Sequence, residues 1–315
     1  MVAGSNPAGR TVQTVGIVSP GAMGSAVGAA YLAAGNRVVT TVAGRSARTI
    51  GLAEQAGLEF LPDIDAVVSE SELVLSIVPP GEAGANAAAI AAAAGRTGSR
   101  PLVADWNAVS PATVRELEQV LVEAGLELVD GSISGGPPRA DYRTRVYLSG
   151  QSAADLVAAA PAWIDARTVG DTVGFASAVK MCTASMYKGS NALLAYALLT
   201  AHAHGVLPQV LDDLGDSFPR QIDRAARTLA ISATKADRFV GEMREIAATQ
   251  AAVGLTPALR EIAATQAAVG LTPALFQAMA EVYEDVAGSA IAAEAPEAIP
   301  SEPDLEDVLD GIAPR

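Results

Sequence analysis

Short apolar runs and longer helical stretches alternate along the first half of the chain. Apolar runs with the length of buried strands occupy residues 11–18, 37–42, 73–78, 101–104 and 126–130. Helical patterns lie between them, and one begins at Ser110 and Pro111, an N-cap residue followed by a first-turn proline. Strands that alternate with helices predict an α/β domain with a doubly wound sheet.

The second half is dominated by one long helical stretch from Phe175 to His204. It has no proline and a single glycine, and at 1.5 Å per residue it would extend about 45 Å. Further helical segments at 206–214 and 220–233 predict an all-α second domain. We therefore predict an α/β domain at 11–173, an all-helical domain at 174–290 and an acidic tail at 291–315, which is mobile or carries one loosely docked helix at 303–312.

A perfect repeat interrupts the helical half. Residues 244–259 read REIAATQAAVGLTPAL, and residues 260–275 read the same. Copies that diverged long ago would differ, so we interpret the pair as a recent in-frame duplication or a sequence-assembly error. Each copy predicts a helix that stops at Gly254 or Gly270 and restarts at Thr-Pro. One copy is then an additional helical segment that the ancestral fold did not need.

Charge and cysteine content exclude several classes of protein. The formal net charge is −14, which disfavours nucleic acid and anionic membranes as partners. The single Cys182 excludes an internal disulfide framework, and the N-terminus lacks the apolar core of a signal peptide. No run is apolar enough to span a bilayer, and the two histidines show no metal-ligand spacing. We expect a soluble, cytoplasmic protein without a bound metal.

The first strand runs into a glycine-containing turn that opens a helix. The turn reads Ser19-Pro20-Gly21-Ala22-Met23-Gly24. A strand, a tight turn and a helix in this order are typical of dinucleotide sites, where the helix N-terminus binds the pyrophosphate. Gly21 would let the backbone approach the phosphates, and Gly24 would let the helix pack closely on the strand. Ser19 stands where the GxGxxG pattern has its first glycine, which is one departure from that pattern.

The segment after the second strand indicates which dinucleotide binds. An NAD site usually has an acidic residue there, whereas this chain has Arg45, Ser46 and Arg48 and no acid. Guanidinium groups bind phosphate in a bidentate way, so these residues suit the 2′-phosphate of NADP. The alternative is that the arginines are only solvated residues at the start of a helix.

Other segments follow strand ends, where ligands bind in doubly wound sheets. Val78, Pro79 and Asn107 occupy such positions, and we assign them to the cofactor site. Ser134-Gly135-Gly136 follows a later strand, and its glycines can present backbone N–H groups to a carboxylate. A plain loop is the alternative interpretation of this last segment.

Taken together, these motifs resemble the β-hydroxyacid dehydrogenase superfamily, which includes 3-hydroxyisobutyrate and 6-phosphogluconate dehydrogenases. The matching pieces are VGIVSPGAMG, GRS, DWNAVSP, SISGGPP and GFASAVKM. The second half, with KMCTASMYKGSNALL and RFVGEMREIAAT, resembles a branch that has a C-terminal domain of unknown function. The resemblance covers about residues 12–287 and implies a Rossmann-type domain followed by an all-α domain.

The resemblance implies a role for each of three segments. Residues Gly21 to Gly24, with Ala22 and Met23 between them, hold the pyrophosphate of NADP(H). Ser134 to Gly136 hold the carboxylate or hydroxyls of the substrate, and Lys180 is the proton donor and acceptor. A lysine shielded from water can take the proton of an alcohol that is oxidised, or supply one to a carbonyl or imine that is reduced.

The chain departs from the family one helical turn after the lysine. The family commonly has asparagine there, and this chain has Ala184. Tyr187 and Lys188 follow on the face of Lys180, and we hypothesise that one of them replaces the asparagine at the substrate. The alternative is that Lys188 extends along the helix surface with its charge in water.

The sequence therefore predicts an NADP-dependent oxidoreductase acting on a small hydroxy acid or its keto or imino counterpart. An imine or ketone reductase of the same fold is one alternative, although such relatives usually lack the lysine. A non-catalytic NADP-binding protein is another, since Ser19, Ala184 and the duplication are compatible with lost activity. We also expect a homodimer built on the helix from Phe175 to His204, which the resemblance supports more than the residue pattern does.

Overall fold

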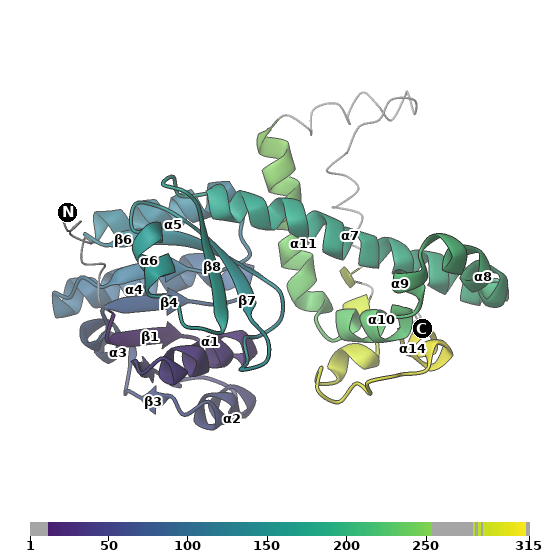
Figure 1. Cartoon of the computed structure of the whole chain (residues 1–315), viewed down its shortest axis with the longest axis horizontal. Coiled ribbons are helices and arrows are strands. Elements are labelled where there is room, and N and C mark those ends of the chain that lie inside the picture. The colour runs from purple at the N-terminus through teal and green to yellow at the C-terminus, as the bar shows by residue number, and fades with distance from the viewer. Residues whose placement is uncertain (1–11, 254–279, 281–282, 285, 313–315) are drawn as a thin grey trace, which may run out of the picture. The chain divides into compact units, whose positions relative to one another are not determined.

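The computed structural model describes residues 12–253, 280, 283–284 and 286–312. The chain divides into two compact units, with the boundary between Met181 and Cys182. This boundary lies inside the long helix α7 (Phe175–Ala203), which confirms the helix predicted from Phe175 to His204 (Figure 1).

The first unit contains an eight-stranded sheet in the order β3-β2-β1-β4-β5-β6-β7-β8. The strands are β1 (Thr14–Val18), β2 (Arg37–Thr40), β3 (Glu59–Phe60), β4 (Leu73–Ser76), β5 (Leu102–Asp105), β6 (Glu127–Ser134), β7 (Thr144–Ser149) and β8 (Ile164–Gly170). Neighbouring strands are parallel except for β6 and β7, which are antiparallel. The predicted doubly wound sheet is confirmed, and its strand order reverses between β1 and β4, where ligands bind in this class of fold.

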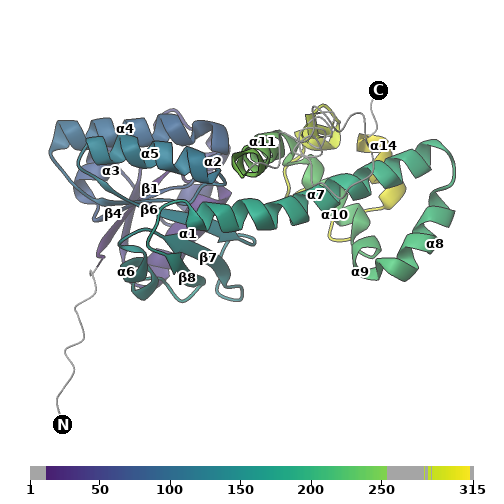
Figure 2. The ribbon, with the colours of Figure 1, turned by 90° about the horizontal axis from the view of Figure 1, so that it is seen from above.

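Helices cover both faces of the sheet. They are α1 (Ala22–Ala33), α2 (Ala47–Gln55), α3 (Ile64–Glu70), the 3-10 turn η1 (Pro80–Glu82), α4 (Ala83–Thr97), α5 (Pro111–Glu123) and α6 (Ala153–Ala158). Helices α3, α4 and α5 lie on one face, and α1 and α6 lie on the other (Figures 1 and 2). The start of α5 is as predicted, since the Ser110 side chain accepts a hydrogen bond from Thr113 N and Pro111 is the first helical residue.

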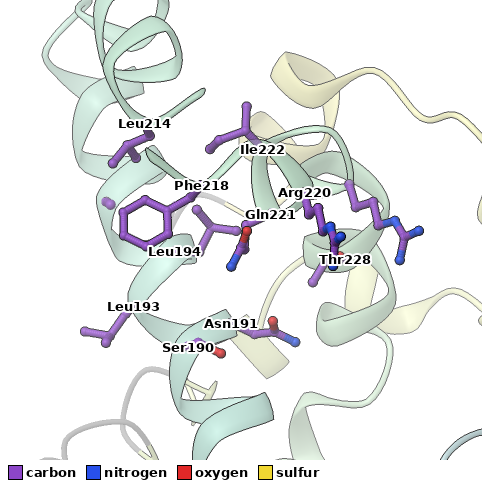
Figure 3. Close-up of a pocket in the computed structure, with 12 residues that line it drawn as sticks. Ser190, Asn191, Leu193, Leu194, Leu214, Phe218, Arg220, Gln221, Ile222 and Thr228 are labelled. Atoms are coloured by element: carbon purple, nitrogen blue, oxygen red, sulfur yellow. The ribbon is translucent and has the colours of Figure 1, made fainter. Parts of the chain in front are cut away.

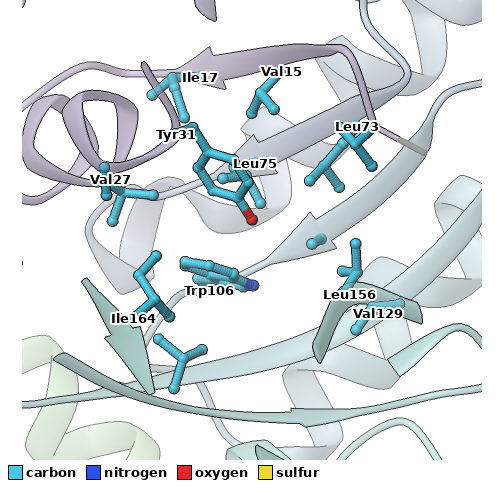
Figure 4. Close-up of a cluster of buried hydrophobic side chains, with 14 of the residues drawn as sticks. Val15, Ile17, Val27, Tyr31, Leu73, Leu75, Trp106, Val129, Leu156 and Ile164 are labelled. Carbon is cyan, nitrogen blue, oxygen red and sulfur yellow. The ribbon is translucent and has the colours of Figure 1, made fainter. Parts of the chain in front are cut away.

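Each face has its own apolar core, because the buried strands present β-branched and leucine side chains to both sides. On the face of α1 and α6, Tyr31 and Leu156 pack with Trp106 from the end of β5 (Figure 4). A Cβ at Gly131 would lie 2.1 Å from Cδ1 of Trp106, so only glycine leaves room for the indole over β6. On the other face, Ile90 of α4 is buried in a second cluster.

The described part of the second unit is helical. After α7 it contains α8 (Leu207–Ser217), α9 (Pro219–Ile222), α10 (Ala225–Ala233), α11 (Ala236–Ala252), η2 (Ile291–Ala293) and α14 (Leu305–Ile312). The single helix predicted at 220–233 was wrong, because the chain breaks between α9 and α10. Arg224 leaves the helical region there, with φ −111° and ψ 4°, and no proline or glycine in the sequence marks the break.

The C-terminal segment carries the amphipathic helix expected at 303–312. Val308, Leu309 and Ile312 of α14 are buried, and His202 of α7 contacts Asp310 at 2.7 Å between Nε2 and Oδ1. The first repeat copy begins within α11, whereas its predicted stop at Gly254 and the whole second copy lie outside the described residues. Among the residues the structure describes, no helix is long and apolar enough to cross a membrane.

Candidate functional site

Five neighbouring strands end at one edge of the sheet. In the order β2, β1, β4, β5 and β6 they are parallel, so the loops after them lie along the same edge. The predicted site residues fall in these loops: Arg45, Ser46 and Arg48 after β2, Ser19 to Gly24 after β1, Val78 and Pro79 after β4, Asn107 after β5, and Ser134 to Gly136 at the end of β6. The topology thus brings together segments that are far apart in the sequence.

The glycine turn after β1 has the shape that a phosphate site needs. Ser19 has φ +65°, and among the described residues it is the one non-glycine residue with a positive φ. This explains why the pattern usually has glycine there, since left-handed backbone costs other residues roughly 1–2 kcal/mol. A Cβ at Gly24 would lie 2.7 Å from the Ser19 carbonyl oxygen, whereas a Cβ at Gly21 would meet nothing within 4 Å.

The start of α1 can accept an anion. Gly21 is the N-cap residue, and no side chain caps the first N–H groups of the helix. Gly21, Ala22 and Met23 are partly exposed, so their backbone is accessible. A helix N-terminus with uncapped N–H groups and open space over Gly21 fits the pyrophosphate of a dinucleotide.

Two arginines follow β2, Arg45 in the loop and Arg48 in the first turn of α2. Arg45 and Arg48 are exposed, and Ser46 Oγ accepts a hydrogen bond from Thr49 N at 3.3 Å and so caps α2. The loop can therefore offer guanidinium groups to a 2′-phosphate. Solvated arginines at a helix start have the same geometry, so the alternative stays open.

Asn107 joins the ends of β4 and β5. Its Oδ1 accepts from Val78 N at 2.6 Å, and its Nδ2 donates to Ser76 Oγ at 3.0 Å and to Asp105 Oδ2 at 2.6 Å. The side chain is buried, with these partners inside the protein. Asn107 therefore holds the loop that begins at Val78 in place, and any contact it makes with the cofactor remains a prediction.

Two buried carboxyl groups lie beneath this edge, and sequence reasoning did not assign them a role. Asp105 and Asp130 are partners in the register of β5 and β6, and both are buried. Burial raises the pKa of Asp105 to about 7, although hydrogen bonds from Ser76 and Asn107 oppose the shift. Burial also raises the pKa of Asp130. Asp105 ends the apolar strand β5, and Asp130 follows Leu128 and Val129 within β6. An acid directly after an apolar run was the sequence signal that could have identified each of them.

Asp130 fixes the first turn of α7. Its Oδ2 accepts from Gly174 N at 2.9 Å, Ser177 N at 3.0 Å and Ser149 Oγ at 3.0 Å, and its Oδ1 accepts from Ser177 Oγ at 2.7 Å. A carboxylate that binds the first N–H groups of a helix acts as an N-cap and suits the positive end of the helix dipole. Strand β6 thereby determines where α7 begins.

Lys180 lies one turn further along α7 and returns to the same strand. Its Nζ donates to the carbonyl oxygen of Ile133 at 2.6 Å, and its side chain is half-buried. Ile133 directly precedes Ser134, so the structure brings the predicted acid/base residue to the start of the predicted substrate loop.

The Ser134 to Gly136 loop is bordered by a tyrosine that the sequence did not reveal. Gly135 has φ +127°, and Gly136 N donates weakly to Tyr142 Oη at 3.4 Å. Thr144 Oγ1 donates to Gly136 O at 2.7 Å and secures the other side of the loop. Tyr142 is partly exposed, so its ring borders the loop without filling it.

The two candidates on α7 beyond Lys180 have different surroundings within the second unit. Lys188 forms an ion pair with the buried carboxylate of Glu242, which also pairs with Arg238 at 3.1 Å, and the Lys188 ammonium lies 5.0 Å from the ring centre of Phe239. Tyr187 is 69% exposed. Lys188 therefore has a structural partner, and the substrate role of either residue stays a prediction. Among the described residues, no three potential metal ligands lie together.

Two protein families match the chain. The NAD-binding domain of 6-phosphogluconate dehydrogenase matches residues 14–163, and a domain of unknown function, DUF1932, matches residues 201–259. The first match covers strands β1 to β7 and the glycine turn. The second ends at Leu259, which is the last residue of the first repeat copy.

Similar solved structures share the fold over most of the chain. A conserved protein of unknown function, described as structurally similar to 3-hydroxyacid dehydrogenases, is 27% identical, with a TM-score of 0.58 over 87% of this chain and 97% of that one. Mycobacterium tuberculosis 3-hydroxyisobutyrate dehydrogenase, solved with L-serine, is 18% identical, with a TM-score of 0.61 over 95% of this chain and 99% of that one. An imine reductase from Myxococcus stipitatus, solved with NADP+, is 18% identical, with a TM-score of 0.53 over 80% of this chain and 95% of that one.

Proposed function

The chain belongs to the β-hydroxyacid dehydrogenase superfamily, in a branch that carries DUF1932, and we propose that it is an NADP-dependent oxidoreductase acting on a small hydroxy acid or its keto or imino counterpart. The observation that supports this most is the 2.6 Å hydrogen bond from Lys180 to Ile133 O, directly before the Ser134 loop. A proton-transfer group thus lies beside a candidate carboxylate site, at the sheet edge that also carries the dinucleotide turn.

Each group in the first unit then has a defined task. Bound NADPH would supply the hydride for reduction, and bound NADP+ would accept it in the reverse direction. Lys180 gives its proton to the oxygen or nitrogen of the group being reduced, and takes the proton of the alcohol or amine in the reverse direction. The bond to Ile133 O orients the ammonium, and the Asp130 cap holds the turn of helix from which Lys180 extends. The Ser134 hydroxyl and the following N–H groups bind the carboxylate of the substrate.

NADP is favoured over NAD by the loop after β2. Arg45 and Arg48 are exposed there, and the segment from Ala43 to Arg48 contains no acid that would bind the ribose hydroxyls of NAD. We assign the 2′-phosphate to these guanidinium groups, with Ser46 maintaining the helix start behind them.

Replacement of Lys180 by methionine tests the proposal. Methionine keeps the length and most of the volume of the side chain but cannot transfer a proton. We expect turnover with NADPH and a panel of keto acids to fall by at least about 10²-fold, the usual contribution of general acid–base catalysis, while NADPH affinity is unchanged. The same replacement at Lys235, a lysine of the second unit to which we assign no role in catalysis, is the matched control. Unchanged turnover in Lys180→Met would overturn the assignment.

An imine reductase is the second candidate, favoured by the shared fold with the imine reductase solved with NADP+. Ala184, where the family commonly has asparagine, is buried and cannot bind a substrate hydroxyl. A substrate panel separates the two candidates. Turnover of cyclic imines that lack a carboxylate, with none of hydroxy or keto acids, would support the imine reductase. NADPH binding without any turnover would support a non-catalytic protein.

We propose that the protein is a homodimer that pairs through α7. Met186 and Tyr187 are 71% and 69% exposed, and Leu193 and Tyr196 on the same helix are also exposed. Large apolar side chains that recur along one helix favour a partner helix. Light scattering should give twice the chain mass, and Leu193→Glu should shift it to the mass of one chain. A wild-type protein that scatters as a monomer at micromolar concentration would contradict the proposal.

A further inference from the structure

A pocket of about 420 Å³ lies in the second unit, among α7, α8, α9 and α10. One wall is apolar and includes Leu194, Leu214 and Phe218, and half of the Phe218 side chain is exposed although it is aromatic. Figure 3 shows the Phe218 ring between Leu194 and Leu214. This volume is within the range of small-molecule sites, which are mostly apolar and contain a few polar groups.

Polar and basic side chains also line the pocket. They are Arg220 and Arg224, together with the amides of Asn191 and Gln221. In Figure 3 the polar ends of Arg220 and Asn191 lie away from the apolar wall formed by Leu214 and Phe218. The pocket therefore has a charged end and an apolar end.

The two arginines have no acidic partner within the part of the chain that the structure describes. The ion pairs of this unit involve Lys188, Arg238, Arg244 and His202 instead. Two guanidinium groups that face one cavity without a carboxylate form a site for an anion.

We propose that this pocket binds an amphipathic organic anion, with its carboxylate, sulfonate or phosphate group at Arg220 and Arg224 and its apolar body against Leu194, Leu214 and Phe218. The inference goes beyond the oxidoreductase activity. All of the residues that line the pocket lie in the second unit, so the proposal does not depend on the nicotinamide site.

Two dyes that share one aromatic body test the proposal on the full-length protein. 8-Anilinonaphthalene-1-sulfonate carries a sulfonate, and N-phenyl-1-naphthylamine is its neutral counterpart. We expect one saturable sulfonate-dye site per chain, with an affinity at least about tenfold higher than that of the neutral dye, because a charge-assisted hydrogen bond contributes more than a neutral one. Added salt should weaken the binding of the sulfonate dye and leave the binding of the neutral dye unchanged.

Variants then locate the site. Replacing Arg220 and Arg224 together by glutamine should lower the affinity for the sulfonate dye by about tenfold or more and leave the affinity for the neutral dye unchanged. Phe218→Ala should weaken the binding of both dyes. Arg227→Gln is the matched control, because Arg227 is on α10 but donates to Pro300 O and does not line the pocket. It should leave the affinity for both dyes unchanged.

Three results would overturn the proposal. One is wild-type affinity for the sulfonate dye in the double variant while circular dichroism shows the protein folded. Another is equal affinity of the wild type for both dyes at low salt, a comparison that needs no variant. The last is sulfonate-dye binding that disappears as protein concentration rises and the scattering mass doubles, which would show that a second copy of the chain fills the pocket.

Discussion

Replacement of Asp105 by asparagine should change how the stability of the first unit depends on pH. Asp105 is buried at the end of β5, and burial raises the pKa of its carboxyl group to about 7 from an ordinary value of 3.8. The folded protein therefore binds this proton more tightly than the unfolded chain does. The contribution of Asp105 to stability is complete below about pH 4 and decreases as pH rises towards 7.

The size of the effect follows from the difference between the two pKa values. One pKa unit corresponds to about 1.4 kcal/mol, so the rise from 3.8 to about 7 lowers the free energy of unfolding by about 4 kcal/mol between pH 4 and pH 8. Asparagine has a similar shape and no titratable proton. The free energy of unfolding of Asp105→Asn, minus that of the wild type, should thus become more positive by about 4 kcal/mol over the same range.

Urea unfolding at five pH values between 4 and 8 measures this difference. The fluorescence of Trp106 and Trp163 reports on the first unit, since both tryptophans belong to it. Asp165→Asn is the contrasting control. Arg167 and Arg145 lower the pKa of Asp165 below its ordinary value of 3.8, so the stability difference between this variant and the wild type should stay constant between pH 4 and pH 8. A constant difference in stability between the wild type and Asp105→Asn throughout this range would refute a raised pKa of Asp105.

Three further substitutions test local features. Lys188→Met should lower the stability of the second unit by about 3 kcal/mol, because it leaves the buried carboxylate of Glu242 without its lysine partner. A raised substrate KM without a change in melting temperature would show instead that Lys188 binds substrate. Gly131→Ala should lower the free energy of unfolding in urea by about 1–3 kcal/mol, because its Cβ would lie 2.1 Å from an indole carbon of Trp106. Gly136→Ala should lower it far less, and an equal loss in the two variants would contradict this packing. Ser19→Gly should raise the free energy of unfolding by about 1 kcal/mol, since Ser19 has φ +65°, and a lower melting temperature would contradict that account.

The sequence predicted the architecture because periodicity and local turn chemistry determine it. Apolar runs separated by helical stretches indicated the parallel sheet, and Ser110 with Pro111 marked the start of α5. The order of the strands places the loops after β1, β2, β4, β5 and β6 along one edge, as the doubly wound rule requires. The prediction of a dinucleotide site rests on these local features.

The missed features depend on contacts between distant segments. Asp130 caps the start of α7, although at least 44 positions in the sequence separate it from the N–H groups that it binds. Asp105 becomes the neighbour of Asp130 only through the pairing of β5 with β6. Glu242 lies on α11 and meets Lys188 of α7, so the apolar setting of Lys188 in the sequence did not reveal an ion pair. Long-range pairing of this kind leaves no periodic trace in a single sequence.

The repeat is the feature that fold rules do not explain. The match to DUF1932 extends through the first copy and ends where the second begins, which agrees with a duplication of one segment. The copies are identical, so the sequence gives no basis for deciding which of them was inserted.

A fluorescence titration of the wild type with NADPH and with NADH, following energy transfer from the tryptophans, tests the central claim most directly. The account predicts saturable binding of NADPH that is at least about tenfold tighter than that of NADH, because the 2′-phosphate gains charge-assisted hydrogen bonds from Arg45 and Arg48. Replacing both arginines by glutamine should remove that preference. Binding of neither dinucleotide would contradict the proposed function, and tighter binding of NADH would contradict the assignment of the arginines.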